Sequence, residues 1–247
     1  MAGNDINWHI GCSGFSYRDW KENFYPKGLA QKNWFDYYAT QFDSLELNVT
    51  FYRFPQLSFL QNWYNKAPAG FLFAVKAPRL ITHYKQFKEV KELLNDFYTT
   101  TKDGLEEKLG AVLFQLPPKF VYTPEALELI ITQLDNSVHN VLEFRHPSWW
   151  NKEVYTILKQ ANITFCSHSY PNLPDEVVST NGVVYYRFHG VPKLYYSEYS
   201  ENFLNNIISS IQKKKTNTKA FLLFNNTATM AAINNARYIK NILGLSQ

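Results

Sequence analysis

Residues 109–145 read LGAVLFQLPPKFVYTPEALELIITQLDNSVHNVLEFR, and this stretch contains a complete strand–helix–strand unit. The short apolar run at 109–115 has the length and composition of a buried strand. Thr123 and Pro124 then supply the side-chain cap and the first-turn proline that are typical of a helix start. The helix that follows carries apolar residues at helical spacing, namely Leu127, Ile130, Ile131 and Leu134. A second strand at 140–145 completes a unit of the parallel type.

The same alternation of strands and helices runs along the whole chain. Eight runs are predicted to be strands: 8–12, 44–47, 72–75, 109–115, 140–145, 163–167, 183–188 and 220–224. Seven of these strands are followed by a predicted helix, at 31–41, 57–65, 88–100, 124–134, 152–161, 201–214 and 228–243. The connection after the sixth strand, which includes residues 171–180, is irregular and has no predicted helix.

This pattern predicts an α/β fold, a single (β/α)8 barrel of the TIM type. Eight strand–helix units in about 250 residues match the size of that barrel. An open doubly wound sheet is the alternative, but residues 11–14 (GCSG) lack the full spacing of the phosphate-binding turn that it requires. The sequence contains no Pro-, Gly- or Ser-rich linker and no internal repeat, so residues 1–247 are predicted to form one domain.

Composition excludes several other classes of protein. With 247 residues, 45% of them hydrophobic and 17% aromatic, the chain has too many core-forming residues to be disordered. No uncharged apolar run reaches the roughly 18 residues of a membrane span. Cys12 and Cys166 lie in separate strand runs without metal-ligand spacing, and they are predicted to be buried, reduced thiols. The first twelve residues lack the basic and apolar segments of a secretory signal, so we expect a cytoplasmic location.

The net charge of +4 gives little support for a nucleic-acid partner. It arises from 25 basic against 21 acidic residues, and 19 of the basic residues are lysines. Nucleic-acid-binding proteins usually carry a clustered basic stripe. The basic run here, KKK at 213–215, follows a predicted helix, where cations complement the helix dipole.

Polar residues at the strand ends are the main functional signal. Within 140–145, Leu142 and Phe144 share one face of the strand. Glu143 and Arg145 share the other face, because side chains alternate along a strand. The apolar face is expected to pack on the helices, which turns the charged face into the barrel, where enzymes of this fold place their active sites. Across all strands this reasoning selects Ser13, Glu46, Asn48, Lys76, Gln115, Glu143, Arg145, Arg187, His189 and Asn225.

The selected residues predict carboxylate chemistry on a small ligand. Glu46 and Glu143 are candidate general acids, general bases or nucleophiles, and His189 is the third candidate catalytic residue. Binding roles are assigned to Ser13, Asn48, Lys76, Gln115, Arg145, Arg187 and Asn225. Three cations against two carboxylates, with neighbouring amides, suit an anionic or polyhydroxylated ligand. A purely structural ion-pair network is the alternative, because buried charges are stable only when they are paired.

Other motifs do not point to a cofactor. No HxH or HExxH spacing supports zinc, so no metal site is predicted, and the cofactor, if the reaction uses one, is unknown. GxSxG and P-loop motifs are absent as well. His146 is expected to cap the segment after the fifth strand, and Trp149 and Trp150 to pack at the start of the next helix.

Several motifs resemble the YecE-like family, a domain of unknown function. They are GCSGFSY at 11–17, FYP at 24–26, ELNVTFY at 46–52, Lys76 with ITH at 81–83, LFQLPP at 113–118, EFRHPSW at 143–149, YRFHG at 186–190 and FNN at 224–226. The resemblance spans nearly the whole chain. It implies a TIM-type barrel and no particular reaction.

Two functional hypotheses follow from the sequence. The first is an enzyme that acts on a small anionic or sugar-like substrate, with hydrolysis favoured and isomerisation close behind. The alternative is a non-catalytic binding protein for a nucleotide or a nucleic acid. The expected partner is therefore a small molecule, with weak support for nucleic acid and none for a membrane.

Overall fold

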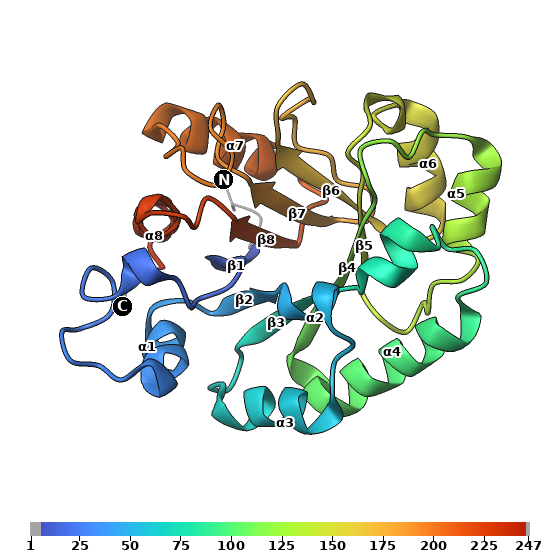
Figure 1. The fold of residues 1–247 in the computed structure, drawn as a ribbon. Coiled ribbons are helices and arrows are strands. Elements are labelled where there is room, and N and C mark those ends of the chain that lie inside the picture. The colour runs from blue at the N-terminus through green and yellow to red at the C-terminus, as the bar shows by residue number, and fades with distance from the viewer. Residues whose placement is uncertain (1–5, 246–247) are drawn as a thin grey trace. The chain divides into compact units, whose positions relative to one another are not determined.

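The computed structural model describes residues 6–245, and its strands form a closed parallel barrel (Figure 1). The strands are β1 (Asn7–Cys12), β2 (Ser44–Leu47), β3 (Leu72–Lys76), β4 (Leu109–Gln115), β5 (Asn140–Glu143), β6 (Thr164–Ser169), β7 (Val183–Phe188) and β8 (Lys219–Phe224). They follow one another around the barrel in chain order. The predicted (β/α)8 fold is thereby confirmed, with each predicted strand present.

Helices follow the strands in the predicted alternation. They are α1 (Trp34–Gln41), α2 (Val49–Tyr52), α3 (Leu57–Lys66), α4 (Lys91–Leu105), α5 (Pro124–Ile131), α6 (Lys152–Gln160), α7 (Glu201–Lys213) and α8 (Ala231–Ile242). The connection between β6 and β7 contains no helix among its described residues, as predicted. Within residues 6–245, none of the helices is both long and apolar enough to cross a bilayer.

The structure corrects the sequence prediction at several places; among them, α5 ends at Ile131 rather than at residue 134, and α8 begins at Ala231 rather than at residue 228. α4 begins at Lys91 rather than at residue 88, because Phe87 (φ 64°) and Glu89 (φ 52°) have left-handed backbone that a helix cannot include. β5 ends at Glu143, so Arg145 lies in the following loop. Two short elements, α2 and a π-helical turn at Leu80–Tyr84, were not predicted, since four or five residues are too few to show a period.

The chain divides into two compact units. Unit 1 joins the residues up to Glu46 with those from Ser167 onward, and unit 2 spans Leu47–Cys166. Unit 1 therefore contains β1, β7 and β8, and unit 2 contains β3, β4 and β5. The prediction of a single domain over residues 1–247 stays a prediction.

In unit 1, β8 pairs with both β1 and β7. Asn7 to Cys12 pair with Lys219 to Phe224, and the same β8 residues pair with Val183 to Phe188. Gly11 allows β1 to approach β2 closely, because a Cβ atom there would lie 1.9 Å from the carbonyl oxygen of Ser44. These pairings bring the carboxyl ends of β7, β8 and β1 to one edge of the sheet.

In unit 2, the loops after the strands are held by aromatic packing and side-chain caps. Thr123 accepts a hydrogen bond from the Ala126 amide and so caps α5, as predicted. His146 accepts one from the Ser148 amide, which confirms its expected capping role. Trp149 is buried and stacks on Phe144 with a centroid distance of 3.9 Å, so it packs in the core rather than offering a surface to a ligand.

Candidate functional site

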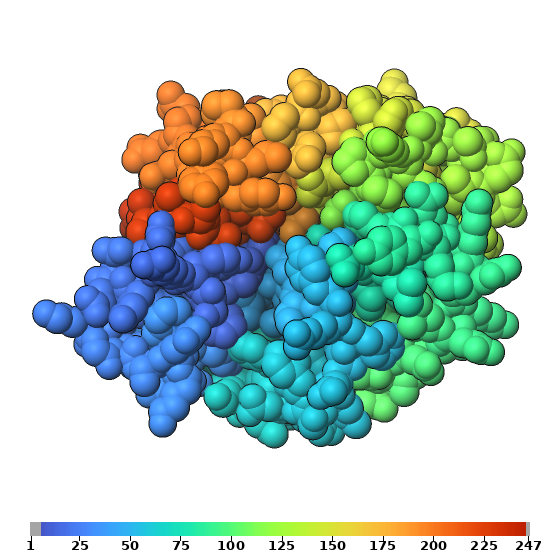
Figure 2. Space-filling model, in the orientation of Figure 1, coloured from blue at the N-terminus to red at the C-terminus, as the bar shows by residue number. Residues whose placement is uncertain are grey.

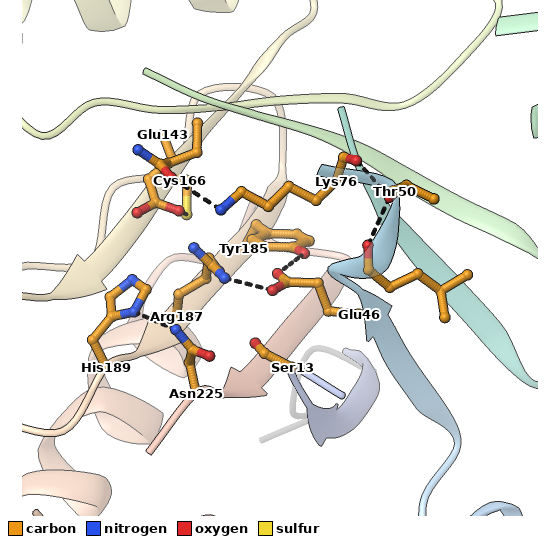
Figure 3. Close-up of polar contacts among 12 residues, drawn as sticks. Ser13, Glu46, Thr50, Lys76, Glu143, Cys166, Tyr185, Arg187, His189 and Asn225 are labelled. Atoms are coloured by element: carbon orange, nitrogen blue, oxygen red, sulfur yellow. Dashed lines mark hydrogen bonds and ion pairs between the residues drawn. The ribbon is translucent and has the colours of Figure 1, made fainter. Parts of the chain in front are cut away.

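We group the predicted site residues and their neighbours into two clusters, one in each unit, and Figure 3 labels several of them. Cluster A lies in unit 1 and comprises Ser13, Glu46, Tyr185, Arg187, His189 and Asn225. Cluster B lies in unit 2 and comprises Asn48, Lys76, His83, Gln115, Glu143, Arg145 and Cys166. Most members sit on the last residues of a strand or directly after it, the position that TIM-type enzymes use for catalysis.

Glu46 is the buried centre of cluster A. Its side chain is inaccessible to solvent, and its two carboxylate oxygens have separate donors. Arg187 Nη2 lies 2.5 Å from Oε1, and the Tyr185 hydroxyl donates to Oε2 over 2.8 Å (Figure 3). A buried carboxylate stays ionised only when charge and hydrogen bonds compensate the lost hydration. The arrangement fixes Glu46 as the anchor of the Arg187 guanidinium.

His189 and Asn225 form a second contact in cluster A. Their strands, β7 and β8, are neighbours, and the Asn225 Nδ2 lies 2.9 Å from His189 Nδ1 (Figure 3). An amide nitrogen can only donate, so His189 Nδ1 accepts, and the ring proton of neutral His189 is on Nε2. His189 is fully buried, and with the proton on Nε2 this nitrogen can donate a hydrogen bond.

Ser13 contributes a buried hydroxyl with unused hydrogen-bonding capacity. Its Oγ has no hydrogen-bond partner among the described residues, although the side chain is fully buried. The backbone is held firmly, because Ser13 N donates to Phe224 O over 2.8 Å and the Tyr17 hydroxyl donates to Ser13 O. Burial raises the pKa of Tyr17 to about 12, which keeps that hydroxyl protonated. A buried polar group without a partner is costly, so the Ser13 hydroxyl suits a ligand.

Glu143 and Arg145 form the ion pair of cluster B. Arg145 Nε donates to Glu143 Oε1, and the Glu143 side chain is fully buried. The Cys166 thiol lies 4.0 Å from Glu143 Oε2, at the limit of a sulfur hydrogen bond. β4 and β5 are in register here, with Gln115 beside Glu143, so the amide and the carboxylate end neighbouring strands.

Lys76 brings a second cation to cluster B. Its Nζ donates to Gln115 Oε1 over 3.0 Å and lies 4.1 Å from the centroid of the Phe51 ring. The Gln115 amide is oriented in turn by its own bond to Leu116 O, at 2.8 Å. Thr50 fixes the end of β3 through a hydrogen bond to the Lys76 carbonyl oxygen, at 2.6 Å (Figure 3). The Gln115 amide therefore positions the Lys76 ammonium group without neutralising its charge.

The pKa of His83 reflects the charges of cluster B. Desolvation and the positive charges of Lys76, Arg145 and Arg79 lower its pKa from 6.5 to about 4, against a smaller opposite effect of Glu143. The ring packs edge-on against Phe51, with a centroid distance of 5.0 Å. Burial is the main cause of the lowered pKa, and the nearby cations lower it further against the smaller opposite effect of Glu143.

We expect nuclear magnetic resonance titration of the His83 ring protons to give a midpoint near pH 4. In the unfolded chain the same ring binds its proton near pH 6.5. Between pH 6.5 and pH 4 only the unfolded chain binds this proton. The stability associated with His83 is therefore fully present above pH 6.5 and is lost as the pH falls toward 4. Lys76→Met is expected to raise the midpoint, and Lys102→Met, which removes an exposed lysine paired with Asp135, to leave it unchanged. A wild-type midpoint near 6.5 would contradict this picture of cluster B.

The structure brings together four pairs of predicted residues. They are Glu46 with Arg187, His189 with Asn225, Lys76 with Gln115, and Glu143 with Arg145. Asn48 Oδ1 is buried without a hydrogen-bond partner in the described part of the chain, as is Ser13 Oγ. Of the residues that sequence reasoning missed, Tyr185 could have been found, because it shares a strand face with Arg187. His83 lies on the unpredicted π-helical turn, so strand alternation could not select it.

The two clusters offer hydrogen-bonding and charged groups rather than a metal site. Within residues 6–245, no group of three His, Cys, Asp or Glu side chains is placed to hold a metal ion. Neither Cys12 nor Cys166 is in a disulfide, and both are buried.

A family profile described as "Protein of unknown function DUF72" matches residues 9–247. The chain belongs to the DUF72 family. This match confirms the resemblance that the strand-end motifs indicated.

Other DUF72 proteins share the barrel. The crystal structure of a DUF72 family protein from Thermotoga maritima MSB8 is 28% identical, with a TM-score of 0.85, and the match covers 96% of this chain and 99% of that one. A DUF72 family protein from Enterococcus faecalis V583 shares the fold at 19% identity, with a TM-score of 0.84 over 97% and 96% of the two chains. The UPF0759 protein YunF of Bacillus subtilis (strain 168) is 27% identical over 154 residues, which are 60% of this chain and 54% of that protein. The chain thus matches about half the length of YunF.

Proposed function

We propose that this DUF72 protein is an enzyme that acts on a small anionic or sugar-like substrate through carboxylate acid–base or nucleophilic chemistry. Hydrolysis is the favoured reaction class, and isomerisation is second. The observation that carries the proposal is the composition of cluster B. Lys76 and Arg145 stand beside one buried carboxylate, Glu143, at the carboxyl ends of barrel strands.

Cluster B would hold the anionic part of the substrate. Lys76 and Arg145 give a surplus of one positive charge over Glu143, and neutral His83 adds none. Charge-assisted hydrogen bonds from lysine and arginine are the strongest ones available to a phosphate or carboxylate group. Gln115 orients Lys76, and the buried carbonyl oxygen of Asn48 would accept a substrate hydroxyl.

Glu143 is the carboxylate that we assign to the reaction. It lies among the cations that would hold the anion, and it would act as general base or nucleophile. Glu46 differs, because both of its oxygens are bonded to Arg187 and Tyr185, and its role would be to position Arg187. Cluster A is a separate candidate site in unit 1, where His189 would donate a hydrogen bond through Nε2 and Ser13 and Asn225 would bind polar groups.

We also propose a cytoplasmic location. It is supported by the two cysteines, which are buried thiols, the usual state of cysteine in a reducing compartment.

An activity screen tests the proposed function. Purified protein is assayed against phosphate monoesters, sugar phosphates, neutral glycosides and the isomerisation of sugar phosphates. We expect turnover in the anionic set, with inhibition by inorganic phosphate. Lys76→Met should raise the KM for the active substrate about tenfold or more, which corresponds to the loss of one charge-assisted hydrogen bond. Lys102→Met is the matched control.

The outcomes separate the alternatives. Turnover restricted to neutral glycosides, or equal kinetics of Lys76→Met and Lys102→Met, would overturn the anionic substrate class. Binding of sugar phosphates without turnover would instead favour the non-catalytic reading.

A further inference from the structure

A second surface of unit 2 has the composition of a docking site. Seven large apolar side chains in residues 49–84 are exposed: Val49, Tyr52, Phe54, Leu57, Phe59, Leu80 and Tyr84. Tyr52 and Tyr84 are each 66% exposed. This segment lies at the surface of the face shown in Figure 2, where it is light blue to teal. Clustered apolar groups on a protein surface are typical of interaction sites, because exposing them to water is unfavourable.

All of these side chains except Leu57 line two adjoining pockets, which we call the aromatic groove. The first pocket, of about 240 Å³, is lined in part by Val49, Arg53 and Phe59. The second, of about 270 Å³, includes Tyr52, Arg79, Leu80 and Tyr84. Phe54 lines both pockets. Its ring packs edge-on against buried Phe97, with centroids 6.2 Å apart, so the groove has a rigid floor at its centre.

The groove lies in a basic segment of the chain. Residues 47–88 contain no Asp or Glu and six basic residues: Arg53, Lys66, Lys76, Arg79, Lys85 and Lys88. This segment has a formal charge of +6, so the rest of the chain has 4 minus 6, or −2. Two arginines line the pockets themselves. The Arg79 guanidinium is 5.6 Å from the Tyr52 ring centroid and 5.4 Å from that of Tyr84, within the range of cation–π contact.

We propose that the aromatic groove binds a segment of another protein in which acidic residues flank aromatic or aliphatic anchors. The two pockets would receive the apolar anchors, and Arg53 and Arg79 would pair with the flanking carboxylates. Tyrosine and arginine are the residue types most often found at the energetic centre of protein interfaces. The proposal concerns a different set of pocket residues from those given catalytic or binding roles, and it does not rest on the proposed function.

The composition of the groove favours a protein segment over other anionic partners. Interfaces with nucleic acid are more polar and far more basic than this one, where seven exposed apolar side chains accompany two lining arginines. Binding at a membrane surface uses a long amphipathic helix. α2 and α3, the helices that carry groove residues, have only four and ten residues. Concave pockets of this size instead suit single side chains of a peptide.

Selection from a random peptide library displayed on phage tests the proposal with the full-length protein. We expect the enriched peptides to combine Asp or Glu with Trp, Phe or Leu. Their affinities, measured by fluorescence anisotropy with synthetic peptides, should fall tenfold or more in the Arg53→Glu, Arg79→Glu double variant. The control is the Lys193→Glu, Tyr196→Ser double variant in unit 1, which changes an exposed lysine and the tyrosine beneath it, at 4.3 Å.

All four substitutions are at exposed or partly exposed positions, and thermal unfolding curves verify that the variants are folded. The proposal is supported if the Arg53→Glu, Arg79→Glu variant loses peptide binding and the Lys193→Glu, Tyr196→Ser variant keeps it. The proposal is overturned if no acidic, apolar consensus is selected, or if both variants bind the peptides like the wild type. Tighter binding of a single-stranded oligonucleotide or of phosphatidylserine vesicles than of any selected peptide would overturn it too.

Discussion

Arg187→Met is expected to lower the free energy of unfolding by about 3–5 kcal/mol, because it leaves the Glu46 carboxylate buried without a compensating charge. Glu46 is inaccessible to solvent and Arg187 is 1% exposed, so water cannot replace the lost partner. The Tyr185 hydroxyl would still donate to Oε2, but a neutral donor does not offset a buried negative charge. Urea denaturation of the variant and the wild type measures the difference.

A double variant distinguishes a buried-charge effect from a packing effect. Glu46→Gln removes the carboxylate charge at nearly constant size, so combining it with Arg187→Met should recover a large part of the lost stability. Arg237→Met is the control, since Arg237 is exposed and bonds Gln41 Oε1 at 3.0 Å; its expected cost is about 1 kcal/mol or less. If the double variant is as unstable as Arg187→Met, the ion pair does not explain the loss.

Glu143→Gln is expected to lower kcat about 10²- to 10⁴-fold on the substrate found by the activity screen, the usual effect of removing a general base. The amide keeps the size of the side chain but cannot accept a proton at neutral pH. Glu107→Gln is the matched control, because Glu107 is an exposed glutamate of the same unit that accepts a hydrogen bond from Tyr64. Its kcat should equal that of the wild type.

The same variants address the structural alternative. Unfolding curves are recorded for Glu143→Gln alongside the kinetics. If the variant loses stability through the broken pair with Arg145 but keeps its kcat, then Glu143 belongs to a structural network and not to the reaction.

The fold was predictable because its signals are local and repeated. The strand at 140–145 alternates Leu142 and Phe144 with Glu143 and Arg145, and Thr123 and Pro124 mark a helix start that the structure confirms. Eight repeats of such signals leave few architectures open. The prediction was wrong where the backbone conformation of single residues sets the start of a helix. Glu89 has left-handed backbone, so α4 begins after it.

Strand alternation selected the candidate site residues, but it did not predict which of them contact one another. Strand alternation selected Glu46 and Arg187, yet their pairing links residues far apart in the sequence, and no local pattern encodes it. Nor does the sequence distinguish Glu46, with both oxygens bonded to buried donors, from Glu143. The absence of acidic residues from 47–88 is visible in the sequence, whereas the exposure of Tyr52 and Tyr84 is a property of the fold.

The most direct test of the central claim, that cluster B holds the anionic group of the substrate, is a crystal structure of the wild type soaked with tungstate, a heavy analogue of phosphate. We predict anomalous density for tungsten at cluster B, with tungstate oxygens about 3 Å from Lys76 Nζ and the Arg145 guanidinium. The density should be absent from Lys76→Met crystals and present in Lys102→Met crystals. Tungstate bound only elsewhere, or bound equally in the Lys76→Met crystals, would contradict the assignment.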